Sequence, residues 1–278
     1  FFALLTGLFI TTIIQSSSAT TVMVVSFVNA GLLTLAQSIG VIFGANIGTT
    51  ITAWIVALFG FKFKIAALAI PVFGFGYILY SIKKFKKETI GEALMGFGLL
   101  FVGLDLLGKV MTFDASQVEF LQHLTGNGYL SLLAGVGAGL VITMLIHSSS
   151  ASTAIILTMS YNKLLPWEFA AAMVLGSNIG TTIDAVLASI GTKVNARRAA
   201  LIHVLFNVIG SIIAIILFKP FLFVVDFIVP GPVESSITTH IAMLHTVFNV
   251  MNSLLFLPFV NQLAFLSEKI ITPKKGET

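Results

Sequence analysis

Two short polar motifs each occur twice in the chain, and their residue types are those that bind small ions. Gln15-Ser-Ser-Ser-Ala-Thr-Thr21 returns as His147-Ser-Ser-Ser-Ala-Ser-Thr153, and Gly44-Ala-Asn-Ile-Gly-Thr-Thr50 returns as Gly176-Ser-Asn-Ile-Gly-Thr-Thr182. Both pairs have the same offset of 132 residues (147 − 15 and 176 − 44). A repeat at a fixed offset marks a duplicated structural unit. We therefore expect the two halves to contribute equivalent residues to one site.

The serine motifs favour an oxyanion as ligand. A helix that begins after each serine run would direct its free N–H groups and its positive dipole end toward the serines. Together with the hydroxyls, these groups could hold a small oxyanion without a positively charged side chain. In the alternative interpretation the serines only bond back to the preceding helical turn, but two triple clusters at equivalent positions favour binding. The candidate residues are Ser16, Ser17, Ser18, Ser148, Ser149 and Ser150.

The second pair of motifs favours a monovalent cation. Gly48 and Gly180 can break a helix and so free carbonyl oxygens, to which asparagine and threonine side chains add neutral oxygens. The alternative is close helix packing through small residues, with hydrogen bonds from the polar ones. The candidate cation ligands are Asn46, Thr49, Thr50, Asn178, Thr181 and Thr182.

Further polar residues fall within apolar segments. Asp184 follows the second cation motif by two residues, where the first repeat has Thr52. An ionisable residue inside a span is a functional candidate by default, so Asp184 is a cation ligand, a proton carrier, or a satisfied polar residue near the cytoplasmic end of its span. Two His-x-x-Phe-Asn segments begin at His203 and His245 and place His and Asn on one helix face. Hydrogen bonding between helices is their favoured role.

An enzymatic interpretation is weak. His147 precedes Ser148 and could act as the base for a serine nucleophile. The equivalent residue in the first repeat is Gln15, which cannot act as a base, and the sequence contains no Gly-x-Ser-x-Gly motif. We therefore expect no enzymatic activity.

Composition assigns the chain to membranes. Of the 278 residues, 57% are hydrophobic and only 9% are charged, and the mean hydropathy is +1.04. A soluble domain carries about 25% charged residues, so a water-soluble fold is excluded. The apolar runs lack the alternation of barrel strands, which predicts an all-α polytopic membrane protein. Cysteine is absent, so disulfides and thiolate metal sites are excluded. The net charge of +4 comes from loop lysines, which indicate orientation in the bilayer and not nucleic-acid binding.

The motifs and apolar runs together predict two inverted-topology repeats with re-entrant hairpins and interrupted transmembrane helices. The first repeat, 1–111, would contain a hairpin at 1–30, an interrupted helix at 34–59 and helices at 65–82 and 90–111. The second repeat, 128–262, would contain a hairpin at 128–163, an interrupted helix at 166–191 and helices at 199–217 and 240–262. The segments beside the serines are short for a crossing of about 20 residues. Three crossings separate the serine motifs, so the second would be inverted relative to the first.

Loop charges predict the orientation of this arrangement. The segment Lys83–Lys87 carries four lysines and should be cytoplasmic by the positive-inside rule. The 112–127 loop, with Asp114 and Glu119, would then be extracellular, 226–236 would be an acidic outer loop, and 263–278 would be a cytoplasmic tail. Because Phe1 begins inside an apolar run, we expect further residues upstream.

The duplicated motifs resemble those of the type II sodium/phosphate cotransporter family, in its bacterial branch, over about residues 1–262. The resemblance implies sodium-driven uptake of inorganic phosphate by alternating access. It also implies that Gln15 and the six serines line the phosphate and sodium site, and that the asparagines and threonines named above complete it. His147 replaces the glutamine that is usual in the second motif, which leaves the sodium stoichiometry open and introduces an ionisable group. Bacterial members often carry a PhoU-like cytoplasmic tail, which the residues after 262 are too few to form.

These observations predict a multi-pass transporter of the cell membrane that couples phosphate uptake to sodium. The predicted sodium ligands are Gln15, Asn46, Thr49, Thr50, His147, Asn178, Thr181, Thr182 and Asp184. We expect phosphate, Na⁺ and the lipid bilayer as partners, no cofactor beyond Na⁺ as coupling ion, and no nucleic acid, and a dimer is compatible with the sequence. Other classes stay open: a transporter of another oxyanion or one coupled to protons, a passive anion channel, and a non-transporting phosphate sensor or scaffold.

Overall fold

A computed structural model describes residues 1–60, 65–110 and 128–273, and these residues form helices without any strand among them. This confirms the expected all-α class. The elements of the first half are α1 (Phe2–Ile14), α2 (Ser17–Asn29), α3 (Leu35–Gly48), α4 (Thr50–Ile55), the π-helical turn η1 (Val56–Gly60), α5 (Ile65–Ser81), the 3-10 turn η2 (Lys83–Phe85) and α6 (Glu88–Val110). Those of the second half are α8 (Tyr129–Ile146), α9 (Ser149–Tyr161), α10 (Trp167–Gly180), α11 (Thr182–Ser189), α12 (Val194–Ile216), α13 (Phe218–Ile228), α14 (Val233–Phe256), the 3-10 turn η4 (Leu257–Phe259) and α15 (Val260–Ile270).

Six helical stretches of the described chain are long and apolar enough to cross a membrane: Leu35–Gly60, Glu88–Val110, Tyr129–Ile146, Trp167–Ser189, Val194–Ile216 and Val233–Ile270. Large apolar side chains on them face outward, such as Leu99 on α6 and Leu145 on α8. Exposed apolar surface of this kind requires lipid or a partner in place of water. The chain is therefore an integral membrane protein. Tyr129–Ile146 is the first helix of the predicted hairpin 128–163. The sequence predicts that this helix is too short to cross a membrane, but its 18 residues are sufficient in length and composition.

The first helices of each half pack together through glycines. α1 lies against α3, and α8 lies against α10. A Cβ atom added at Gly44 or at Gly176 would lie 1.8 or 1.9 Å from a backbone carbonyl oxygen of the facing helix. Gly7 and Gly139, on the facing helices, are equally crowded, at 2.0 and 1.9 Å. Such contacts between small residues let membrane helices approach closely, and the same contacts occur at positions 132 apart in both halves.

A methyl group at these contacts is expected to destabilise the protein. Gly44→Ala and Gly176→Ala should each reduce the free energy of unfolding by about 1–3 kcal/mol, because the facing backbone must move to make room. The measurement is the thermal unfolding temperature of the purified protein in detergent. Gly96→Ala is the matched control, since nothing lies within 4 Å of its added Cβ. Equal melting temperatures for the three variants would show that the helix pairs are loosely packed.

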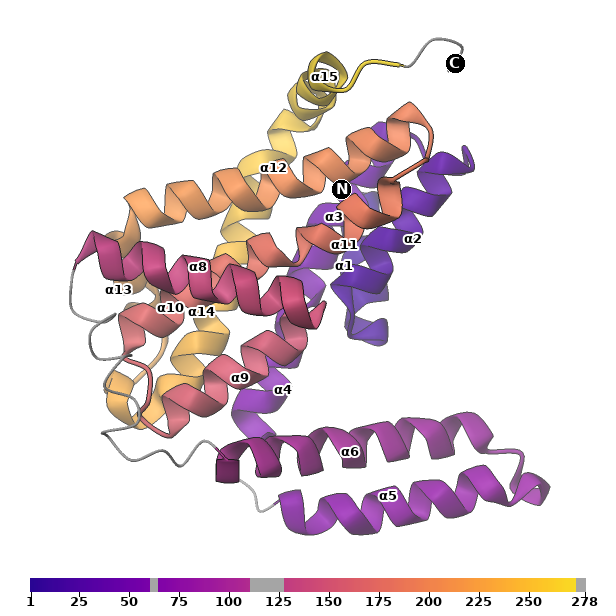
Figure 1. Ribbon diagram of the computed structural model, residues 1–278, viewed down its shortest axis with the longest axis vertical. Helices are drawn as coiled ribbons and strands as arrows, with labels where there is room; N and C mark the ends of the chain where they lie inside the picture. The colour runs from indigo at the N-terminus through magenta and orange to yellow at the C-terminus, as the bar shows by residue number, and fades with distance from the viewer. Residues whose placement is uncertain (61–64, 111–127, 274–278) are drawn as a thin grey trace.

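The two halves differ in where their last two long helices lie. α12 contacts α2, α3, α10 and α11, and α14 contacts α3, α4, α9 and α10, so both occupy the centre of the molecule. Their sequence equivalents, α5 and α6, pack mainly on each other and lie at one edge, with α6 touching α9 (Figure 1). The first helices of the two halves therefore pack in the same way, whereas the last two long helices of each half do not.

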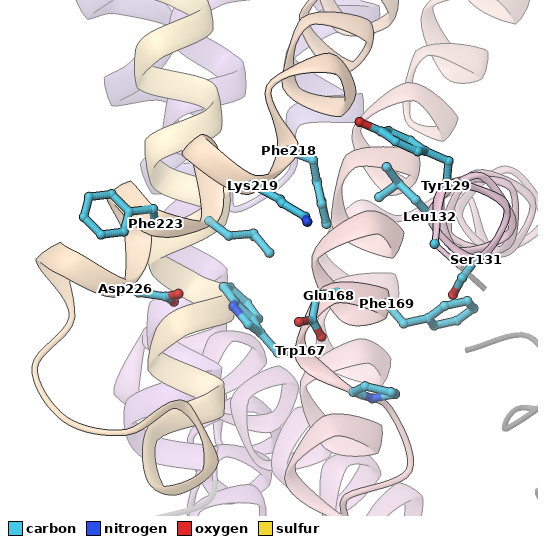
Figure 2. A pocket seen from close by; sticks show the side chains of 13 residues that line it. Tyr129, Ser131, Leu132, Trp167, Glu168, Phe169, Phe218, Lys219, Phe223 and Asp226 are labelled. Atoms are coloured by element: carbon cyan, nitrogen blue, oxygen red, sulfur yellow. The ribbon is translucent and has the colours of Figure 1, made fainter. Parts of the chain in front are cut away.

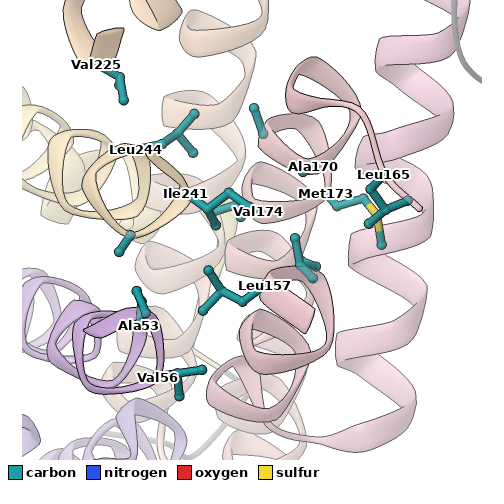
Figure 3. Close-up of a cluster of buried hydrophobic side chains, with 14 of the residues drawn as sticks. Ala53, Val56, Leu157, Leu165, Ala170, Met173, Val174, Val225, Ile241 and Leu244 are labelled. Carbon is teal, nitrogen blue, oxygen red and sulfur yellow. The ribbon is translucent and has the colours of Figure 1, made fainter. Parts of the chain in front are cut away.

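Two clusters of buried apolar side chains fill the centre. One joins α4, α9, α10, α13 and α14, and Figure 3 shows Leu157, Val174 and Ile241 meeting within it. The other joins α2, α3, α11, α12 and α15, and in it Phe43 stacks on Phe206 with ring centroids 4.5 Å apart. These clusters set the helices around the polar motifs.

Several element boundaries differ from the sequence-based expectation. α12 begins at Val194 and not at 199, because its polar first turns continue the helix beyond the apolar run, where Arg198 Nε donates to the carbonyl oxygen of Ile271. α13 and α14 occupy most of the expected outer loop 226–236, and α14 begins directly after Pro232, a residue suited to a helix start. The expected tail 263–278 begins inside α15. The predicted loop 112–127, with Asp114 and Glu119, lies outside the described residues.

Candidate ion-binding site

The two serine motifs fold into turns with the same backbone conformation. We call residues 15–18 the first serine turn and residues 147–150 the second. Gln15 and His147 end their helices in the left-handed conformation, with φ of 59° and 56°. Ser16 and Ser148 follow in extended conformation, and a new helix starts at the next residue. A residue other than glycine costs about 1–2 kcal/mol in this left-handed region, and such strain is concentrated at functional sites.

The first serine of each turn caps the helix that follows it. Ser16 Oγ accepts a hydrogen bond from the amide N–H of Ala19 at 3.1 Å, and Ser148 Oγ accepts one from Ala151 at 3.2 Å. The interpretation in which the serines only bond to the preceding turn is therefore wrong for these two. Because an α-helix leaves its first N–H groups without intrahelical partners, the amides of the second and third serines remain available in each turn.

Asp184 joins the two turns in one half of the molecule. Ser18 Oγ, from the first turn, donates a hydrogen bond to Asp184 Oδ2 at 2.5 Å. His147 Nδ1, from the second turn, lies 2.6 Å from Asp184 Oδ1. The carboxylate side chain is 12% exposed, whereas the imidazole is half exposed. Asp184 thus connects the first repeat to the second through its two carboxylate oxygens.

Thr52 makes the equivalent connection in the other half. Thr52 Oγ1 donates to Gln15 Oε1, from the first turn, at 2.7 Å. Ser150 Oγ, from the second turn, donates to Thr52 Oγ1 at 3.4 Å. Each position two residues after a Gly-Thr-Thr segment therefore bonds to the serine turn of its own repeat and to the third serine of the other. The two serine turns meet, as the duplication predicts.

This crossed arrangement is symmetric in geometry and asymmetric in charge. One half contains a carboxylate and an imidazole, and the other contains an amide and hydroxyls. The carboxylate accepts short hydrogen bonds, which are stronger than those between neutral groups. Thr52 was not among the predicted site residues, although the offset of 132 places it at the position of Asp184 and could have identified it.

The six serine hydroxyls differ in their hydrogen-bond partners. Two of the six cap helices and two bond to Asp184 or Thr52. Ser17 and Ser149 remain, each at the start of its helix and buried, with 3% and 6% of the surface exposed. Ser16 and Ser148 accept through their oxygens and keep their own O–H groups for a ligand. The predicted set of six hydroxyls therefore stays a prediction, in which Ser17 and Ser149 are the two members without a capping or cross-repeat bond.

The predicted asparagine and threonine ligands lie in the cores of α3–α4 and α10–α11. Asn46 Nδ2 donates to the carbonyl oxygen of Ile42, and Asn178 Nδ2 donates to that of Val174. The hydroxyls of Thr50, Thr181 and Thr182 donate to carbonyl oxygens three or four residues earlier in the chain, at the interruptions between α3 and α4 and between α10 and α11, whereas Thr49 Oγ1 is buried without a hydrogen-bond partner. No recorded hydrogen bond in the described chain joins these six residues to the serine turns.

Gly48 and Gly180 are the last residues of α3 and α10, and each lies close to a facing helix. Added Cβ atoms would lie 2.7 and 2.6 Å from the carbonyl oxygens of Leu8 and Leu140, so these glycines serve close packing. The helices are interrupted at the next residue, Thr49 or Thr181, whose backbone stays in the right-handed helical region. Packing through small residues therefore applies to both glycines, while the expectation of carbonyl oxygens freed for a cation at the interruptions stays a prediction.

The His-x-x-Phe-Asn segments form an interhelical hydrogen bond at one of their two histidines. His245 Nε2, on α14, lies 3.2 Å from Asn178 Oδ1, on α10. His203, on α12, is fully buried, and neither of its ring nitrogens has a recorded hydrogen-bond partner. The second histidine therefore follows the expectation and the first does not.

A cavity of about 790 Å³ lies away from the serine turns, between α8, α10 and α13. Figure 2 shows Trp167, Glu168 and Lys219 among the side chains that line it. None of the ligands predicted from the sequence lines this cavity. Its position does not support a role as the predicted ion site.

Buried polar groups that meet between broken helices inside a membrane protein are typical of solute and ion transporters. The comparison with known families specifies this class further. The chain belongs to the Na⁺/Pi-cotransporter family, whose model matches residues 1–109 and 111–225. Each matched segment contains one serine motif and one Asn-Ile-Gly-Thr-Thr motif.

Several curated proteins are similar to the chain. "Uncharacterized protein YqeW" of Bacillus subtilis is 33% identical over 98% of this chain and 85% of that protein. "Putative inorganic phosphate export protein YjbB" of Escherichia coli is 28% identical over 95% of this chain, which spans about half (47%) of that protein. "Sodium-dependent phosphate transport protein 2A" of Rattus norvegicus is 47% identical over 41% of this chain and 19% of its own length. No solved structure matches the chain.

Proposed function

We propose that the chain is the transport unit of a sodium-coupled transporter of inorganic phosphate in the cell membrane. The observation that carries the proposal is the crossed contact of the two serine turns through Asp184 and Thr52. It brings two helix starts and two buried serine hydroxyls together from separate halves of the chain. The family and the printed names of the relatives support phosphate and sodium as the transported species.

In this proposal phosphate binds at the starts of α2 and α9. Ser17 and Ser149 would contribute hydroxyls, and the uncapped amides at the two helix starts would contribute N–H donors. The positive ends of two helix dipoles would favour the anion. None of the recorded hydrogen bonds of the turns comes from lysine or arginine. The anion would therefore need another source of compensating charge.

Sodium supplies that charge in the proposal. Asp184 carries a carboxylate that is mostly buried beside the second turn, and Gln15 and Thr52 add neutral oxygens on the other side. Asn46, Thr49, Thr50, Asn178, Thr181 and Thr182 remain candidate ligands, of which Thr49 has an unpaired buried oxygen. A cation and an anion close together in a poorly screened interior stabilise each other. Each should then bind more tightly when the other is present, and by the same factor.

Alternating access in this proposal depends on the repeats being inverted in the membrane, with α1–α2 and α8–α9 as re-entrant hairpins. Two features support that topology. The serine turns share one conformation, and Figure 1 places the α5–α6 turn and the α11–α12 turn, both with basic residues, toward the same side of the molecule. Helix α13 lies toward the opposite side of the molecule (Figure 1). The proposed mechanism does not require a dimer, although it is compatible with one.

The direction of transport has a second candidate. The name of the Escherichia coli relative refers to phosphate export, whereas the sequence predicts uptake. A coupled transporter moves its substrate in the direction that the combined gradients favour, so both directions are compatible with one site. The driving gradient in the cell would decide between them.

The test is uptake of radiolabelled phosphate into proteoliposomes that contain the purified protein. We expect the initial rate of uptake under an inward sodium gradient to be at least about tenfold higher than under an equal choline gradient. A tenfold change corresponds to about 1.4 kcal/mol of free energy. Saturation with phosphate concentration would separate a transporter from a passive channel. Equal rates in sodium and choline would rule out sodium coupling, and stimulation by a proton gradient alone would favour proton coupling.

A further inference from the structure

Four asparagines on four central helices adopt the same side-chain arrangement. Each donates its Nδ2–H group to the carbonyl oxygen four residues earlier in its own helix, at distances of 2.8–3.0 Å: Asn46 on α3, Asn178 on α10, Asn207 on α12 and Asn249 on α14. All four are buried. One N–H of each amide is thereby used within its own helix, and the Oδ1 atom is left as an acceptor for other groups.

Asn207 and Asn249 lie on α12 and α14, near the contact that Asn252 makes between these two helices. Asn252 Nδ2 donates to the carbonyl oxygen of Phe206 at 3.0 Å, and a Cβ atom added at Gly210 would lie 2.3 Å from the Asn252 amide. Asn207 directly follows Phe206, and Asn249 lies one helical turn before Asn252. His245, one turn before Asn249, connects α14 to Asn178 on α10.

The acceptors of these two asparagines are not satisfied by the protein. Asn207 Oδ1 and Asn249 Oδ1 have no hydrogen-bond partner, and both side chains are fully buried at 0% exposure. His203 and His245 contribute further unpaired ring nitrogens. Buried polar atoms in native proteins are nearly always paired with protein, water or an ion. Two oxygens from different helices therefore indicate a small ligand that is positive or that donates hydrogen bonds.

We propose that Asn207 and Asn249 are ligands of a monovalent cation of the sodium class, in addition to the residues of the serine turns. The named residues are neutral, and calcium and magnesium sites in proteins rely on carboxylates. Neutral oxygens between membrane helices suit a single positive charge. The adjacent Phe43, Phe206 and Phe256 rings, packed 4.5–6.5 Å apart, keep the surroundings apolar, which strengthens the attraction. A role of this site in coupling sodium to phosphate transport rests on the proposed function, whereas the binding of a cation there does not.

Cation binding at this site should be visible as stabilisation of the purified protein. The experiment measures the unfolding temperature in detergent during a titration with NaCl, without phosphate, at constant ionic strength kept with choline chloride. We expect sodium to raise the unfolding temperature of the wild type. Asn207→Ala and Asn249→Ala should each raise the half-maximal sodium concentration at least about tenfold, because an oxygen ligand to a charge is lost. Asn261→Ala, an exposed residue of α15, is the matched control and should titrate like the wild type.

A second variant separates a cation from an enclosed water molecule. Asn249→Asp keeps Oδ1 and adds a negative charge, so it should lower the half-maximal sodium concentration. A wild type that is equally stable in sodium and choline overturns the proposal. So does an unchanged sodium titration in all three variants, which would indicate a water molecule bound between the two oxygens.

The outcome is independent of the uptake measurement. If sodium stabilises the wild type and the asparagine variants lose that effect while a sodium gradient drives no phosphate uptake, the site stands and the proposed function fails. If uptake is driven by sodium while the asparagine variants titrate normally, the proposed function stands and this site does not.

Discussion

Asp184→Ala is expected to lower the initial rate of phosphate uptake about 100-fold or more. The substitution removes the acceptor of Ser18 from one serine turn and the partner of His147 from the other. Hydrogen bonds to charged groups contribute about 1.5–3 kcal/mol each to stability. Without these two bonds, the two serine turns should no longer be held in a fixed position relative to each other. The measurement is radiolabelled uptake into proteoliposomes under a fixed sodium gradient.

Two further variants make this result specific. Asp184→Asn keeps an oxygen that can accept from Ser18 and should give an intermediate rate. Glu92→Gln changes a carboxylate on the exposed surface of α6 and should leave the rate unchanged. Wild-type uptake by Asp184→Ala would mean that transport does not depend on the connection between the turns, and would remove the main support for the proposed site.

Ser149→Ala is expected to abolish or severely weaken transport while the protein remains folded. Ser149 is buried at the start of α9, and its hydroxyl is one of the two that neither cap a helix nor join the turns. If it donates to bound phosphate, its loss should cost about 1.5–3 kcal/mol of binding free energy, which corresponds to a 10- to 100-fold weaker apparent affinity. Uptake as a function of phosphate concentration measures this change.

The neighbouring serine provides an internal comparison. Ser148 caps α9, so Ser148→Ala should lower the thermal unfolding temperature by loss of about 1 kcal/mol. Ser149→Ala should leave that temperature nearly unchanged and affect phosphate affinity. Ser26→Ala, on the exposed side of α2, should change neither quantity. Normal uptake by Ser149→Ala would indicate that the second serine cluster serves packing only.

The sequence was informative where residue type alone determines the environment. Long apolar runs without charge predicted the membrane helices, and the repeated offset predicted that the serine turns are equivalent and meet. Asp184 stood out because a carboxylate in an apolar run needs a partner. What the periodicity could not supply was the identity of that partner, because Ser18 is 166 residues away and the contact depends on how α11 packs against α2.

The roles of glycine and of individual hydroxyls were also beyond the sequence. Gly48 could end a helix or allow close packing, and it does both, because α3 ends there and the backbone of Leu8 faces it. Each serine run looks uniform along the chain, yet its three members cap, remain at the helix start, or bond across the turns according to backbone direction. The central position of α12 and α14, in contrast to α5 and α6, depends on long-range packing that the duplication does not determine.

The glycine contacts between α1 and α3, and between α8 and α10, have a mechanical consequence. Backbones that leave no space for a methyl group cannot shear past each other without clashing, so each pair is expected to behave as a stiff lever. A rearrangement that admits solvent from one side or the other would then pivot one lever against the other. The pivot would lie at the left-handed residues Gln15 and His147, where the side-chain bonds to Thr52 and Asp184 would have to exchange.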